Sequence, residues 1–93
     1  MTYAIEYILW KDAVSEDAWK NIDEIDSHYH PIETVGIVVR ETNEVISVSL
    51  NHDISSNNFS CTIHIPQAMI IHRQKLNINK RSMRERDNEI NRI

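Results

Sequence analysis

The chain has 93 residues, a formal net charge of −4, one cysteine, one glycine and 41% hydrophobic residues. This length suffices for one small domain with a modest core, and the absence of any run of about 18 apolar residues excludes an apolar membrane-spanning helix. The single glycine excludes a glycine-rich phosphate loop, and the single cysteine excludes an intramolecular disulfide and is typical of a reducing cytoplasm.

The first predicted strand runs from Tyr3 to Trp10, with apolar residues on both of its faces. Ser15 then follows as a candidate helix N-cap. Apolar residues recur at helical spacing beyond it, with acidic residues on the other side. This pattern predicts a short amphipathic helix over about residues 16–26, which places Trp19 on the sheet or across one end of a barrel.

The segment from Thr34 to Leu50 predicts a β-hairpin around which the domain is organised. Its two halves alternate β-branched apolar residues with other residues, and the polar run 41–44 between them is typical of a turn. Gly36 lies inside the first half. Because a glycine within a strand usually marks a bulge or a close backbone approach, we expect this strand to bend there.

The remaining elements are a strand over 59–65, a tight turn beginning at Pro66 and a short strand over 70–76. This order of elements favours a small five-stranded SH3-like or Sm-like barrel, which has no free sheet edges. A strongly bent open antiparallel sheet is the alternative. We therefore expect one mainly-β domain over residues 1–76 and a charged, helical tail over residues 77–93.

The charges divide the chain into two unequal parts. Residues 1–71 contain eleven acidic and three basic residues, whereas residues 72–93 contain seven basic and three acidic residues. The acidic candidates for binding lie on the predicted helix, where they could imitate a phosphate backbone: Asp23, Glu24 and Asp26. The basic candidates lie towards the C-terminus: Arg73, Lys75, Arg81 and Arg84. The tail has three interpretations: it docks on the acidic body of a neighbouring molecule, it contacts nucleic acid, or it is a helix that is merely solvated.

Residues suited to catalysis or metal binding form no recognisable pattern. Cys61 falls on the apolar side of a predicted strand and is interpreted as a small core residue. The histidines His28, His30 and His52 lack the tight recurrent spacing of zinc sites, and the acidic residues of the predicted helix look solvated rather than tuned for acid–base work. We therefore expect no enzyme activity, no cofactor and no bound metal.

Four short motifs carry a resemblance to a group of proteins: Trp10-Lys11-Asp12-Ala13, Trp19 with Ile22-Asp23-Glu24-Ile25, Thr34-Val35-Gly36-Ile37-Val38-Val39 with Glu41, and Ile65-Pro66 with Ile70. Together they make residues 3–76 resemble small proteins common in bacteriophage and prophage genomes. The resemblance implies a phage-encoded accessory protein that acts in the host cytoplasm, and counter-defence is one role that this setting implies. The tail beyond Leu76 lies outside the resemblance.

Three hypotheses for the function follow. The first is a binding protein, expected to be a homo-oligomer, that blocks a host protein or sequesters a small nucleotide signal. The second is an Sm-like module that binds nucleic acid through the basic C-terminal segment, which the net acidic body opposes by repelling phosphate. The third is a structural or assembly protein of a virion. We expect no membrane partner, and the N-terminal residues lack the pattern of a signal peptide.

Overall fold

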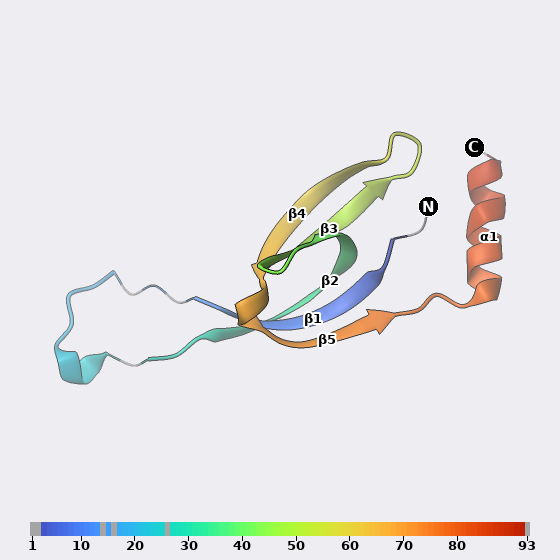
Figure 1. Cartoon of the computed structure of the whole chain (residues 1–93). Coiled ribbons are helices and arrows are strands. Elements are labelled where there is room, and N and C mark those ends of the chain that lie inside the picture. The colour runs from blue at the N-terminus through green and yellow to red at the C-terminus, as the bar shows by residue number, and fades with distance from the viewer. Residues whose placement is uncertain (1–2, 14, 16, 26, 93) are drawn as a thin grey trace.

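A computed structural model describes residues 3–13, 15, 17–25 and 27–92 of the chain. It shows five antiparallel strands in a single open sheet, followed by one C-terminal helix (Figure 1). The elements are β1 (Ile5–Asp12), the 3-10 turn η1 (Ile22–Glu24), β2 (His30–Glu41), β3 (Val45–Asp53), β4 (Asn58–Pro66), the 3-10 turn η2 (Gln67–Met69), β5 (Ile70–Leu76) and α1 (Lys80–Asn91). The expectation of a mainly-β chain with five strands and a helical tail is confirmed.

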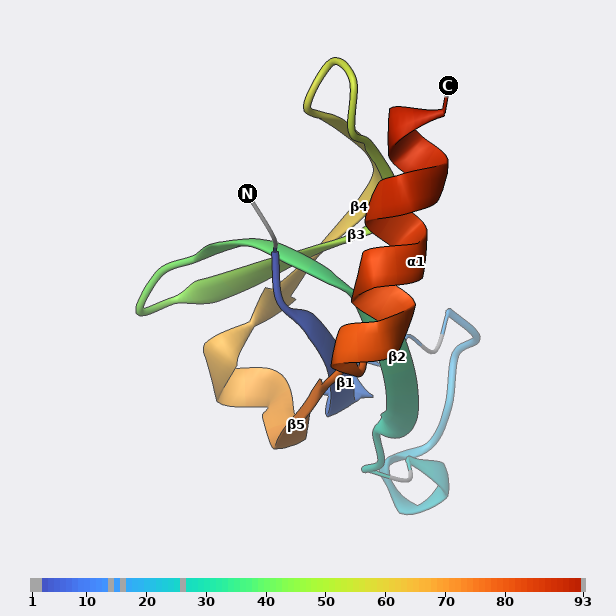
Figure 2. The same ribbon diagram turned by 90° about the vertical axis from the view of Figure 1, so that its right-hand side faces the viewer.

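The sheet has the strand order β4-β3-β2-β1-β5, so β4 and β5 are its two edges. The predicted closed barrel is therefore wrong, and the bent open sheet is the correct alternative. The bend is concentrated in β2, where the register with β3 shifts between Val38 and Arg40. It folds the β3–β4 hairpin over the inner face of β1 and β2 without bringing β4 against β5 (Figure 2).

Gly36 lies beside this bend, as predicted for a close approach of two strands. A Cβ atom at this position would lie 2.6 Å from Val48 Cγ1 and 2.9 Å from the carbonyl oxygen of Ser49. Because β3 comes so near, a larger residue does not fit without a shift of β3.

The core lies in the fold of the bent sheet and is small. Its buried apolar side chains are Ile8, Trp10, Ile46, Val48 and Ile65, with Ile32, Val38 and Ile70 packed around them. The indole N–H of Trp10 donates a hydrogen bond of 2.9 Å to Thr34 Oγ1, which satisfies the polar atom of this buried ring. Cys61, predicted to belong to the core, is exposed on β4. The register with β3 is the same on both sides of Cys61, and its neighbours Leu50 and Ile63 are exposed too. This end of the hairpin therefore lies beyond the core, which the alternating pattern alone does not reveal.

The described residues between β1 and β2 (13, 15, 17–25 and 27–29), called the arm below, project from one end of the sheet (Figure 1). The predicted amphipathic helix over 16–26 is wrong for the described part of that range, which contains only the turn η1. Trp19, Ile22 and Ile25 are all exposed. A short helix depends on packing of its apolar face, and here that face finds no surface within the described chain.

Helix α1 projects from the opposite end of the sheet and has no extended contact with any described strand. The chain therefore extends over 63 Å along its longest axis, with a radius of gyration of 18.2 Å. A compact domain of this length has a radius of gyration of about 12 Å. The arm and α1 account for the difference.

Because α1 lacks tertiary support, its first turn should depend strongly on its N-cap, Asn79. The Asn79 side chain accepts a hydrogen bond of 2.8 Å from the amide of Ser82. We expect Asn79→Ala to weaken the helix by about 1 kcal/mol, seen as a loss of ellipticity at the helical wavelengths in circular dichroism. Asn88→Ala, within the same helix, should instead leave helicity unchanged or raise it, because alanine is the better helix former there. Equal losses in both variants would contradict the capping role.

Candidate functional site

A pocket of about 520 Å³ lies between the sheet and α1. Its lining comes from the chain start at β1, from β2, from the end of β3 and from β5 with α1: Tyr3, Ala4, Ile5, Ile37, His52, Ile54, Lys75, Leu76, Asn77, Ile78, Met83 and Arg86. Figure 2, which looks from the α1 side, shows the helix standing across this end of the sheet. The short extended segment between β5 and α1 holds the helix away from the strands and so leaves the pocket open.

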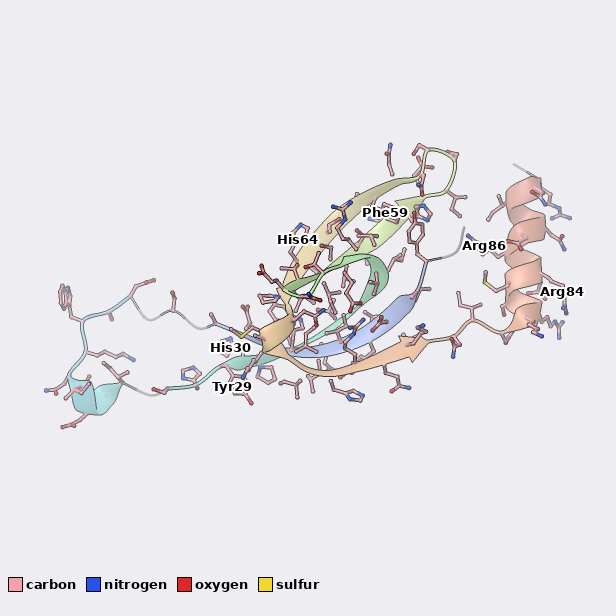
Figure 3. The ribbon with its side chains drawn as sticks, in the orientation of Figure 1. Tyr29, His30, Phe59, His64, Arg84 and Arg86 are labelled. Carbon is pink, nitrogen blue, oxygen red and sulfur yellow. The ribbon has the colours of Figure 1, made fainter. Side chains whose placement is uncertain are left out.

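The charged side chains of the pocket are both cationic, because Lys75 and Arg86 line it and no carboxylate does. In Figure 3 Arg86 is on the side of α1 that faces the sheet, whereas Arg84 is on the opposite side. Arg86 Nη1 donates a hydrogen bond of 3.0 Å to Asp87 Oδ1, outside the lining. Lys75 has no ion-pair partner among the described residues. The pocket thus combines apolar walls with a net positive charge.

One wall of the pocket is held by an aromatic cluster. The rings of His52 and Phe59 are stacked with centroids 4.3 Å apart, and Tyr3 meets both edge-on at 5.2 and 5.0 Å. His52 Nε2 forms a hydrogen bond of 2.8 Å with Asn57 Oδ1. These contacts fix the ring faces of Tyr3 and His52 where a planar ligand could pack.

Arg73, a predicted binding residue, lies instead in a network of ion pairs on the inner face of the sheet. Its guanidinium forms two hydrogen bonds with Glu6, of 2.9 and 2.8 Å, and two with Glu41, of 3.1 and 2.9 Å. The Glu6 side chain is 8% exposed. The hydrogen bond from Arg73 lowers the pKa of the Glu41 carboxyl below its usual value. Because all these donors already have partners, Arg73 fits a structural role, and the proposals below do not use it.

The other predicted site residues are dispersed. Lys75 is in the pocket, but Arg81 is paired with Glu85 at 3.2 Å on the exposed side of α1. Asp23 and Glu24 lie on the arm, far along the molecule from the pocket, and Asp26 lies outside the described residues. The acidic and basic candidates are therefore not brought together within one chain.

The histidines do not assemble into a site in the described part of the chain. The rings of His28 and His30 are 5.8 Å apart at the base of the arm, and His52 lies in the aromatic cluster at the other end of the sheet. Within the described ranges no three metal-ligating side chains come together.

Sequence reasoning missed Tyr3, His52, Met83 and Arg86 as neighbours in one pocket. The seven-residue recurrence of Leu76, Met83 and Ile90 was the one available signal, because it gives α1 an apolar side. Nothing in the sequence indicated that Tyr3 and His52 meet, since they are brought together by the bend of the sheet.

Comparisons with protein-family models, with curated proteins and with solved structures found no match. Within the described residues no helix is both long enough and apolar enough to cross a bilayer.

Proposed function

We propose that the protein is a non-enzymatic, phage-type accessory binding protein that holds a small anionic ligand of the nucleotide class in the pocket between the sheet and α1. The lining of the pocket carries this proposal. Lys75 and Arg86 supply charge for phosphate oxygens. Tyr3, His52 and the apolar walls supply a surface for a base. The volume of about 520 Å³ is within the usual range of small-molecule pockets, roughly 300–1,000 Å³.

Sequestration rather than catalysis fits the side chains that are present. Among the described residues, the pocket lining contains no cysteine, serine, threonine, aspartate or glutamate. The histidine of the lining, His52, has Nε2 hydrogen-bonded to Asn57 and its ring stacked on Phe59, so the side chain that most often acts as a general base is already engaged. A protein that acts by sequestering its ligand needs only to bind the ligand tightly and to be abundant, and it needs no catalytic groups. In the setting that the phage resemblance implies, the ligand is a host nucleotide signal, and its capture in the host cytoplasm counters a defence response.

Ligand binding by the full chain tests the proposal directly. We expect AMP, cyclic AMP or cyclic di-AMP to raise the melting temperature by several degrees in a thermal-shift assay, because a ligand that binds the native state stabilises it. Adenosine without phosphate and inorganic phosphate without a base should each bind weakly. Reversal of one pocket charge, in Arg86→Glu or Lys75→Glu, should lower the affinity by at least about tenfold.

Arg40→Glu is the matched control, since Arg40 is exposed on β2 and is not part of the pocket lining. This variant should bind as the native protein does. If all three reversals weaken binding equally, the effect is one of overall charge and the pocket is not the site. If no nucleotide shifts the melting temperature, the proposal fails and an assembly role becomes the better hypothesis.

Nucleic-acid binding is the second candidate, and one observation favours it. Lys80, Arg81 and Arg84 lie in the exposed N-terminal half of α1, where the helix dipole adds positive potential. Binding of this kind predicts an affinity for single-stranded oligonucleotides that falls steeply with salt and disappears when residues 77–93 are removed. A salt-insensitive affinity for mononucleotides in the same protein would instead identify the pocket.

A further inference from the structure

Two parts of the chain expose apolar side chains that a monomer leaves in water. The first is the arm, where Trp19 is fully exposed and Ile22 and Ile25 are exposed as well. The second is the outer face of β1, β2 and β5, opposite the core. Six apolar side chains share this outer face: Ile5, Tyr7, Leu9, Val35, Ile37 and Leu76.

The outer face is continuous across three paired strands. Ile5 is paired with Ile37 on β2 and with Leu76 on β5, and the next row on the same face pairs Tyr7 with Val35. The row at Ile5 lines the pocket beside α1, whereas Val35, in the next row, is 53% exposed. Val35 and Leu76 are exposed and the other four apolar side chains are half-buried. The polar residues that share the same face are Glu33, His72 and Gln74. An apolar patch rimmed by polar side chains is typical of an interaction site.

The two ends of the molecule carry opposite charge. Residues 13–29 contain five carboxylates and one lysine, whereas residues 75–86 contain five basic residues and one carboxylate. The arm and α1 leave the sheet at its opposite ends, so that the molecule extends over 63 Å with the sheet between them. The acidic end of one copy is therefore complementary to the basic end of another.

We propose that the outer face is an interface between two copies of this chain, which pack it face to face about a two-fold axis with their long axes antiparallel. In this arrangement the acidic arm of each copy lies on the basic N-terminal half of the other copy's α1. The contact between arm and helix then occurs twice, once at each end of the dimer, because a two-fold axis repeats every contact of the interface. In this arrangement Trp19, which is fully exposed in one chain, leaves water.

This inference goes beyond the proposed function and does not depend on it. A dimer forms whether or not a nucleotide binds, and a nucleotide can bind the pocket of a monomer. Because the row of side chains at Ile5 lines the pocket and also belongs to the outer face, the dimer places each pocket at the edge of the contact between copies.

The test measures the mass of the full chain by analytical ultracentrifugation over a range of concentrations, for the native protein and for Val35→Glu. We expect a native dimer and at least a roughly tenfold increase in its dissociation constant for the variant, because two glutamates then meet at the interface. Leu50→Glu is the matched control, since Leu50 is 66% exposed on β3, away from the outer face, and should leave the dimer intact. Circular dichroism checks that both variants keep the fold.

Charge reversal tests the contact between the arm and the helix. Asp23→Lys with Glu24→Lys in one variant, and Lys80→Glu with Arg84→Glu in another, should each weaken the homodimer by at least about tenfold. Equimolar mixing should restore dimers, because each reversed end then meets its opposite charge. The second variant leaves the Arg81–Glu85 pair in place.

Several results would overturn the inference. A native monomer at all concentrations excludes the interface, and a larger ring or a growing filament excludes two-fold pairing. A dimer that tolerates Val35→Glu but not Leu50→Glu uses another face. Reversed variants that do not dimerise when mixed exclude the contact between the arm and α1.

Discussion

Gly36→Ala is expected to lower the free energy of unfolding by about 1–3 kcal/mol, the usual cost of overpacking a well-packed site. The added methyl group would lie 2.6 Å from Val48 Cγ1 and 2.9 Å from the backbone oxygen of Ser49. Val48 is buried in the core and the oxygen belongs to a paired strand, so neither can move freely. Urea unfolding followed by circular dichroism, at a fixed protein concentration, measures the loss.

Leu50→Ala provides the control for this experiment. Leu50 lies on β3, the strand that approaches Gly36, but its side chain is 66% exposed, so its truncation removes little packing in the core. If Gly36→Ala proves no more harmful than Leu50→Ala, β3 can move away from β2 and the bend does not depend on the glycine.

Arg73→Met is expected to cost about 3 kcal/mol, the lower end of the cost of breaking a buried ion pair, because the Glu6 carboxylate is left without its partner while the Arg73 side chain is itself 29% exposed. Glu6, with a side chain 8% exposed, loses both of its hydrogen bonds from the guanidinium. The same urea unfolding measures this loss. Combining Arg73→Met with Glu6→Gln should recover a large part of it, because the isolated negative charge is then gone.

The second carboxylate of the network provides a contrast. Glu41 has a side chain 45% exposed, so Glu41→Gln should cost less than about 1 kcal/mol. Because the folded-state pKa of Glu41 is lowered from its usual value of 4.5, its contact with Arg73 stabilises the fold above that pH. This contribution disappears as the pH falls through the folded-state pKa. The stability of Glu41→Gln should therefore fall less on acidification than that of the native protein. Equal costs for Glu6→Gln and Glu41→Gln would contradict the difference in burial.

The parts of the fold that were predicted correctly are those whose partners are close in sequence. The hairpin around residues 41–44 formed as predicted, because its alternating residues and its turn lie within one short segment. The fifth strand, over 70–76, was also located correctly. Closure of the barrel could not be decided in this way, since it depends on how far the bend at β2 carries β4 towards β5.

The wrong and missing predictions share a physical cause. The apolar spacing around Trp19 predicts a helix with one buried side, but within the described residues no surface lies beneath that side and Trp19 is fully exposed. The pocket went unnoticed because Tyr3, His52 and Met83 belong to three distant segments. Arg73 was taken for a ligand-binding cation, since its pairing with Glu6 across the β1–β5 ladder is invisible in the linear sequence.

The base of the arm is closed by the sheet itself, because Asp12 at the end of β1 is paired with His30 at the start of β2. The arm thus leaves the sheet and returns to it at neighbouring positions. The entropic free-energy cost of closing such a loop rises slowly with loop length, by about 0.6 kcal/mol for each doubling. The arm can therefore be lengthened, shortened or replaced in the course of evolution with little effect on the folding of the strands. The surface that the arm presents to solvent can thus change in a segment whose cost to the fold is small.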